Sequence, residues 1–138
     1  MIQTRPAIQP DAYTPNVETL KMPFTVFKVI SSSAWAEALI VGAFAGSADD
    51  VRDGYIHLSS AKQFNSTLSK YFKGQSDLLL IAFDVRSLGP MLVWEPSRGG
   101  DLFPHFYGHL PVAKALWQRP LFLNDSAVPQ VDPAWLGC

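Results

Sequence analysis

The stretch "DLLLIAFDV" at residues 77–85 decides the fold class of this chain. Its apolar residues follow one another without alternation, which is typical of a central strand covered on both faces. Gly89 and Pro90 then turn the chain toward "MLVW" at residues 91–94. We expect these two segments to be neighbours in one sheet.

Residues 61–72, "AKQFNSTLSKYF", have the pattern of a surface helix just before this strand. The apolar face, at i, i+4, i+7 and i+8, consists of Phe64, Leu68, Tyr71 and Phe72. Ser60 and Gln63 have the S-x-x-Q spacing of a capping box, so the helix begins there, and Gly74 ends it. We expect this face to pack in the core.

A strand and a further helix are expected nearer the N-terminus. Residues 24–30, "FTVFKVI", are β-branched and aromatic, which favours a strand. The serines that follow can cap a helix around "AWAEALIVG", which ends at Gly42. Its buried stripe is expected to consist of Trp35, Ala38 and Leu39. Residues 45–54 then form a loop.

Residues 55–59, "YIHLS", alternate between polar and apolar side chains, as a half-buried strand does. Ile56 and Leu58 would face the core, and the polar side chains around them would face the other way. This polar face consists of Tyr55, His57 and Ser59. The alternation therefore predicts that the histidine points away from the core, immediately before a capped helix.

The C-terminal half adds two more segments with strand character. "HFYGHL" at residues 105–110 alternates again. One face of this strand would carry His105, Tyr107 and His109. A short turn or helix near residues 112–116 then leads to a final strand, "WQRPLFL", at residues 117–123.

These elements predict one α+β domain over residues 23–123, a mixed or split antiparallel sheet of roughly six strands with two or three helices. The 138 residues are enough for one ordinary domain. Residues 1–22 are rich in proline and have no apolar face, which indicates a flexible arm that can be removed with little loss of folding. Residues 124–138 indicate an irregular C-terminal tail.

Composition and charge exclude several classes of protein. Lys and Arg number 11 and Asp and Glu number 12, so no global basic field attracts duplex nucleic acid or an anionic membrane. The single cysteine, Cys138, has no partner for an internal disulfide. The N-terminus lacks the pattern of a signal peptide, and no apolar stretch is long enough to span a membrane. We expect a cytoplasmic protein with a small anionic or nucleotide ligand, and the sequence leaves its oligomeric state open.

His57 is the first candidate for chemistry, because the common catalytic motifs, such as the P-loop, G-x-G-x-x-G, H-E-x-x-H and C-x-x-C, are missing. It lies beside the expected start of a helix, where free N–H groups favour an anion, and Ser59 could add a hydroxyl donor. That corner could bind phosphate or carboxylate. His57 could equally be an ordinary hydrogen-bonded strand histidine.

A second polar cluster lies in "WEPSRGGDLFPHFYGH" at residues 94–109. Its polar and aromatic side chains include Trp94, Glu95, Arg98, His105, Tyr107 and His109. Gly99 and Gly100 let the backbone approach a ligand closely. Tyr107 and Trp94 could either pack in the core or stack on a base or a nicotinamide ring. The spacing of the three histidines and the nearby carboxylates matches no familiar metal-ligand pattern, so we expect no metal.

Arg98 and Glu95 each have a functional and a structural interpretation. Arg98 could clamp a phosphate with two hydrogen bonds or form an ion pair with Asp101. Glu95 could act as a general base, stabilise a positively charged transition state, or pair with Arg98. We expect His57 and Arg98 to share one anion-binding pocket.

Three stretches, "VFKVISSSAW", "DGYIHLSS" and "WEPSRGGDLFPHFYG", resemble an uncharacterised bacterial family of small domains of unknown function. The resemblance runs from about Phe24 to Leu123. Members of that family typically read D-G-F-I-H-L-S and W-E-P-S-R-G-G-x-x-F-P-H-L-Y-G-P-L. His109 stands where the family usually has proline.

That family is in turn distantly similar to the ADP-ribosyltransferase fold, which includes the RNA 2′-phosphotransferases. The resemblance implies an ADP-ribosyltransferase-like fold with NAD as the ligand. In such enzymes an early strand supplies a His or Arg, a strand leading into a helix supplies a Tyr or His, and a late carboxylate or histidine completes the site. The corresponding positions here are Lys28, His57 and either Glu95 or His105.

The leading hypothesis is therefore a domain that binds NAD or a related nucleotide and transfers or hydrolyses its ADP-ribosyl group. The catalytic residues would be His57, Glu95 and His105. The ligand-binding residues would be Lys28, Ser59, Arg98, Gly99, Gly100 and Tyr107. Two alternatives stay open: a non-enzymatic module that senses a small anionic metabolite, and a hydrolase in which His57 and Glu95 activate a water molecule.

Overall fold

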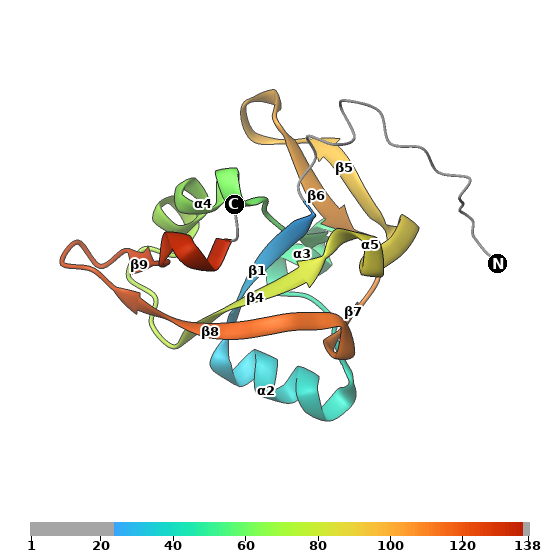
Figure 1. Ribbon diagram of the computed structural model, residues 1–138, viewed down its shortest axis with the longest axis horizontal. Helices are drawn as coiled ribbons and strands as arrows, with labels where there is room; N and C mark the ends of the chain where they lie inside the picture. Colours follow the sequence, from blue (N-terminus) through green and yellow to red (C-terminus); the bar gives the residue numbers. More distant parts are fainter. Residues whose placement is uncertain (1–23, 137–138) are drawn as a thin grey trace.

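Figure 1 shows the fold over residues 24–136, which this computed structural model describes apart from the side chain of Arg98. The arm predicted for residues 1–22 and Cys138 lie outside the described residues. The strands pair in an antiparallel manner in every ladder of this range. The predicted α+β class is confirmed, with four α-helices in residues 24–136 where the sequence predicts two or three. No helix in this range is both long and apolar enough to cross a membrane.

The largest sheet has four strands in the order β1-β4-β8-β9. These strands are β1 (Thr25–Ser31), β4 (Leu78–Asp84), β8 (Ala115–Leu123) and β9 (Pro129–Gln130). β4 lies between β1 and β8, and its residues Leu80, Ile81 and Phe83 are fully buried. The apolar run at residues 77–85 is thus the central strand that the sequence predicts.

A second sheet has the order β3-β6-β5, and a short pair joins β2 to β7. These strands are β2 (Ala43–Phe44), β3 (Ile56–His57), β5 (Leu92–Pro96), β6 (Leu102–Phe106) and β7 (Leu110–Pro111). The predicted pairing of residues 77–85 with "MLVW" is wrong, because β5 pairs with β6 in this second sheet. Between β4 and β5, the helix α5 (Val85–Leu88) and the 3₁₀ turn η2 (Gly89–Met91) carry the chain from one sheet to the other.

The two sheets meet where β1 crosses the segment that follows β3. Phe27 and Ser59 exchange two backbone hydrogen bonds, with N···O distances of 2.8 and 2.9 Å. In the second sheet, the Leu58 N–H donates to the Pro104 carbonyl at 3.0 Å. The strand expected at residues 55–59 therefore contacts both sheets. The two sheets together form the split antiparallel sheet that the sequence predicts.

The helix α2 (Ser32–Val41) packs against the first sheet (Figure 1). The Ser31 side chain caps it, as predicted. Trp35 and Ala38 are buried, and the Trp35 indole N–H donates to a side chain of β8 at 2.6 Å. The prediction for Leu39 is wrong, because it is 52% exposed. The sheet covers the side of the helix that carries Trp35 and Ala38, three residues apart, and Leu39 lies beside that stripe.

The capping box predicted before the next helix is present, since the Ser60 N–H donates to Gln63 Oε1 at 3.0 Å. One turn of 3₁₀ helix, η1 (Ala61–Gln63), leads into α4 (Phe64–Tyr71). The buried or partly buried side chains of the apolar face are Phe64, Leu68 and Phe72. Tyr71 is exposed, at the edge of that face.

A helix, α3 (Ala48–Asp53), lies in the stretch 45–54 that the sequence predicts to be a loop. Ser47 and Asp50 form a capping box: the Asp50 N–H donates to Ser47 Oγ at 3.3 Å, and the Ser47 N–H donates to Asp50 Oδ2 at 2.8 Å. The S-x-x-D spacing is the sequence signal for this helix. It is easily overlooked because the helix is short and carries no apolar stripe.

The segment after β8 is folded, in contrast to the irregular tail predicted for residues 124–138. β9 pairs with β8, and the 3₁₀ helix η5 (Pro133–Leu136) follows. Its apolar side chains Val128, Val131, Trp135 and Leu136 pack against the core cluster that contains Phe27, Phe64 and Leu68. Figure 1 shows the segment folding back from the β8–β9 hairpin toward α4. The turn predicted near residues 112–116 is the 3₁₀ helix η4 (Val112–Lys114).

Candidate functional site

A cavity of about 330 Å³ lies where the two sheets meet; apolar side chains such as Phe64 and Phe72 line part of it, and we call it the polar cavity after the charged side chains on its other part. Its lining includes four residues predicted from the sequence, Lys28, His57, Ser59 and His105. It also includes polar residues of α3 and its flank, Ser47, Asp49, Asp50, Arg52 and Asp53. The backbone bridge between Phe27 and Ser59 brings β1 and the end of β3 to the same space. One cavity thus gathers residues from motifs that lie far apart in the sequence.

Asp50, only 2% exposed, is the centre of the polar network in this cavity. Lys28 Nζ lies 3.2 and 3.0 Å from its two carboxylate oxygens. The backbone N–H of His57 donates to Oδ1 at 3.0 Å, and His57 Nδ1 lies 2.6 Å from the same oxygen. Burial acts to raise the pKa of the Asp50 carboxyl, but the hydrogen bonds from His57 and the charge of Lys28 outweigh it and hold that pKa below its usual range. Asp50 is therefore ionised and fixes both partners in place.

Lys28 is 8% exposed, so its ion pair with Asp50 is removed from water. Burial lowers the pKa of the Lys28 ammonium group, and the negative charge of Asp50 offsets part of that effect. A buried ammonium group needs such a partner, because leaving it unpaired is strongly unfavourable.

His57 is held between two carboxylates. Its Nδ1 faces Asp50, and its Nε2 lies 3.0 Å from Asp53 Oδ2. An ionised carboxylate only accepts hydrogen bonds, so the contact of Nδ1 with Asp50 fixes the orientation of the His57 ring with Nδ1 as the donor. Arg52 pairs with Asp53 at 3.0 Å, and these contacts lower the pKa of the Asp53 carboxyl, with Arg52 as the larger cause.

Tyr55 connects this network to the second histidine. Its ring is stacked on His105 with a centroid distance of 4.0 Å, and it lies 4.7 Å from the His57 ring and 5.4 Å from the Tyr107 ring. The antiparallel register pairs His57 directly with His105 across β3 and β6. The register of the second sheet thereby brings the two histidine motifs into one site.

Glu95 of β5 completes the site behind His105. Glu95 Oε1 lies 2.7 Å from His105 Nδ1 and accepts a hydrogen bond from the Tyr107 hydroxyl, also at 2.7 Å. The hydrogen bond with Glu95 raises the pKa of Tyr107 to about 12, and those from Tyr107 and His105 lower the pKa of Glu95. His105 is 3% exposed and lines the cavity, so Glu95 acts on the cavity through this histidine.

The glycines and the arginine predicted to bind phosphate lie at the tip of the β5–β6 hairpin. The 3₁₀ turn η3 (Arg98–Gly100) there has φ of 64° at Gly99 and 84° at Gly100, a backbone region that favours glycine. Ser97 lines the polar cavity and Gly99 lines a neighbouring one, so the backbone of Arg98 stands between the two. The phosphate clamp and the pair with Asp101 depend on a side chain outside the described structure, and they stay predictions.

Of the face predicted for His105, Tyr107 and His109, the first two meet at Glu95 Oε1 and at the Tyr55 ring, but His109 does not join them, because β6 ends at Phe106 and a bend follows. His109 is exposed just after that bend. Trp94 is partly buried and packs against the core cluster that contains Val26, Ile81 and Phe106, so its packing interpretation is confirmed.

The start of α4, where the sequence suggests an anion site, is filled largely by the chain's own groups. Gln63 accepts from the Ser60 N–H, and Ser59 Oγ lies 3.3 Å from Thr67 Oγ1. Ser59 still lines the cavity. Its role as a donor to a ligand stays a prediction.

Sequence reasoning missed the two carboxylates that hold His57, Asp50 and Asp53. The capping-box spacing from Ser47 could have located the start of α3, but not the position of that helix against β1. Tyr55 could have been chosen as a site residue, because the alternation in residues 55–59 places it on the same face as His57.

The fold and this cavity define a small antiparallel α+β domain with a buried ionic network between two sheets. The chain belongs to the family described as "Protein of unknown function (DUF952)", which matches residues 29–118. The expected resemblance to a family of domains of unknown function is thereby confirmed. A comparison with curated proteins gives no match.

Solved structures of one relative share this fold. The crystal structure of protein CC0527 from Caulobacter crescentus is 40% identical, covers 83% of this chain and 99% of its own, and has a TM-score of 0.79. The solution NMR structure of CC0527 is 42% identical over 78% of this chain and 93% of its own, with a TM-score of 0.71. The architecture is therefore that of an experimentally determined relative.

Proposed function

We propose that this domain binds NAD or a related nucleotide and transfers or hydrolyses its ADP-ribosyl group. The observation that carries the proposal is the convergence of Lys28, His57 and the His105–Glu95 pair on one cavity. The proposal includes an ADP-ribosyltransferase-like fold, and these are the positions that such a fold would use for its ligand. A cavity of about 330 Å³ is at the lower end of the size range for small-molecule sites and suits one nucleoside-sized group.

The charges around the cavity support a substrate that becomes positive at its reacting centre. Asp49, Asp50 and Asp53 line the cavity, and Glu95 lies behind His105. When the bond between ribose C1′ and the nicotinamide nitrogen breaks, the bonding pair leaves with nicotinamide and the ribose becomes positive. An oxygen of water or of an acceptor then bonds to C1′ and gives up its proton. Fixed carboxylates stabilise such a centre more than water does, because they need no reorganisation.

In this proposal four of the site residues have assigned tasks. Glu95 stabilises the positive centre, and His57 or His105 positions the ribose or moves a proton. Lys28, held by Asp50, donates to oxygens of the ligand.

The proposal is tested by incubating the purified protein with NAD and measuring released nicotinamide. We expect release above a blank without protein, and a loss of about a hundredfold in Glu95→Gln and in His57→Ala. Glu37→Gln is the matched control, since it makes the same change at an exposed position of α2. Release no faster than the blank from a folded protein would contradict the proposal.

A non-enzymatic module that senses a small anionic metabolite is the second candidate. It is favoured by the geometry of His57, because both ring nitrogens already contact carboxylates and a proton transfer has to break one of these contacts. A melting temperature that rises with NAD, ADP-ribose or a nucleotide, without nicotinamide release, would support this candidate over the enzyme.

A further inference from the structure

We propose that a second cavity, next to the polar one, binds the pyrophosphate of the ligand, so that the ligand spans two cavities of different charge. This inference rests on the proposed function, because it takes a pyrophosphate-bearing nucleotide as the ligand class.

The second cavity, of about 550 Å³, lies between α4 with its preceding turn η1 and the tip of the β5–β6 hairpin. Lys62, Ser66 and Lys70 line it from one side. Ser66 and Lys70, four residues apart, lie on one face of α4, and Lys62 lies in η1 just before it. Asp101 is the one carboxylate among the described lining residues, so the two ammonium groups leave this cavity with a net positive charge.

The two cavities adjoin. Phe103 lines both of them, and Ser59 of the first is followed directly by Ser60 of the second. The Gln63 side chain donates to the Leu102 carbonyl at 2.6 Å and so fixes the start of α4 against β6 at the boundary. In this proposal the ligand passes Phe103 between the two cavities.

The cations of the two cavities differ in how far the chain's own carboxylates already neutralise their charge. In the first cavity, Lys28 and Arg52 are paired with the aspartates of α3. In the second, Lys62 and Lys70 are exposed, and neither forms an ion pair within residues 24–136. Lysine binds phosphate as a point charge, so these two side chains suit the pyrophosphate, while the carboxylates of the first cavity suit the cationic nicotinamide end.

Titration calorimetry with three probes tests the inference: inorganic pyrophosphate, ADP-ribose, and nicotinamide riboside, which carries no phosphate. The double variant Lys62→Glu/Lys70→Glu should bind pyrophosphate and ADP-ribose at least about tenfold more weakly. Its affinity for nicotinamide riboside should change less than about twofold, because that probe reaches only the first cavity.

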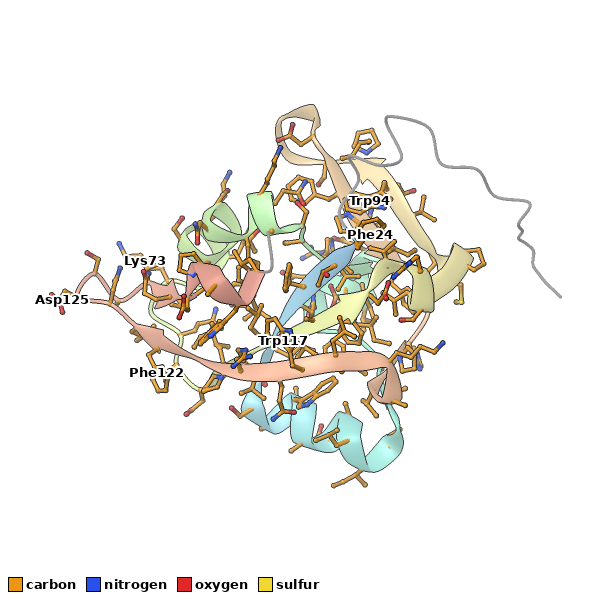
Figure 2. The ribbon with its side chains drawn as sticks, viewed as in Figure 1. Phe24, Lys73, Trp94, Trp117, Phe122 and Asp125 are labelled. Atoms are coloured by element: carbon orange, nitrogen blue, oxygen red, sulfur yellow. The ribbon has the colours of Figure 1, made fainter. Side chains whose placement is uncertain are left out.

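The matched control is Lys73→Glu/Lys114→Glu, which makes the same change in net charge at two exposed lysines outside both cavities. Lys73 follows the end of α4, on the side of the β8–β9 hairpin (Figure 2). This control should bind all three probes as the wild type does.

The outcomes separate this inference from the proposed function. Wild-type affinity for ADP-ribose in the Lys62→Glu/Lys70→Glu protein, or a loss no greater than in the control, would overturn the inference even if NAD is consumed. Failure of the wild type to bind either pyrophosphate or ADP-ribose would overturn it as well. Binding that depends on these lysines, without any nicotinamide release, would support the second cavity and reject the ADP-ribosyl chemistry.

Discussion

Asp50 shows how one buried side chain can hold a whole site together. Its carboxylate contacts Lys28 from β1 and both the backbone and the ring of His57 from β3. It also caps its own helix through Ser47. Three elements are therefore joined at a single ionised group.

Replacing Asp50 by Asn should lower the free energy of unfolding by about 3–5 kcal/mol, because the buried Lys28 loses its counter-charge. Urea unfolding measures this loss. Asp49→Asn makes the same change at an exposed neighbour and should stay within about 0.5 kcal/mol of the wild type. Equal effects in the two variants would mean that the Asp50 network does not support the fold.

The stability of the protein should fall in acid, and Asp50 should account for much of the fall. The pKa of Asp50 is depressed in the folded state, so its contribution is complete above the unfolded pKa of about 4. The contribution is lost progressively as the pH falls below 4 toward the folded pKa, because the unfolded state then binds the proton more readily. Between pH 5 and pH 2, the free energy of unfolding should accordingly change less with pH for Asp50→Asn than for the wild type, as measured by urea unfolding at each pH. The same slope in both would locate the acid sensitivity elsewhere.

At the scale of residues, the sequence predicts the histidines of the site better than the carboxylate that holds His57. Alternation and the family resemblance identify His57, Ser59 and His105, and all three line one cavity. Asp50 is missed because its importance depends on where α3 packs. Capping spacing shows that a helix begins, but not which buried ammonium group its carboxylate meets.

Among the elements, α4 offers the clearest test of core packing. Leu68→Ala should cost about 2–5 kcal/mol in stability, because Leu68 is fully enclosed by the sheet and the C-terminal segment. Leu39→Ala makes the same change in α2 at a half-exposed position and should cost less than about 1 kcal/mol. Denaturant midpoints measure both, and a loss below about 0.5 kcal/mol for Leu68→Ala would place that helix face in solvent.

Element type can be predicted from this sequence more readily than element pairing. β1, β4, α2 and α4 follow from local periodicity and caps. The partner of β5 does not, because a short helix and a 3₁₀ turn after β4 change the direction of the chain, and local spacing does not fix that direction. β9 and η5 could not be predicted for a similar reason. Trp135 packs on a core cluster formed by distant parts of the chain, and the proline-rich local sequence does not indicate this contact.

For the molecule as a whole, the C-terminal segment should be necessary for stability. A chain that ends at Asn124 lacks β9 and the apolar contacts of Val128 and Trp135, and it should lose about 2–4 kcal/mol. Figure 2 shows Phe122 and Asp125 at the outer end of the β8–β9 hairpin, and neither residue lines the cavity. Urea unfolding compares this chain with one that lacks residues 1–22, for which the sequence predicts little loss. An unchanged urea midpoint in the chain that ends at Asn124 would mean that the C-terminal segment does not contribute to stability.

The contact between Phe27 and Ser59 affects how late in folding the cavity forms. The cavity exists only after β1 has met both β4 and Ser59, and after β3 has met β6. Folds dominated by such non-local pairings need milliseconds to seconds to fold, because distant parts of the chain must first find one another. During synthesis, His105 leaves the ribosome long after Lys28. The chain must therefore extend beyond His105 before the cavity that could hold a ligand is complete.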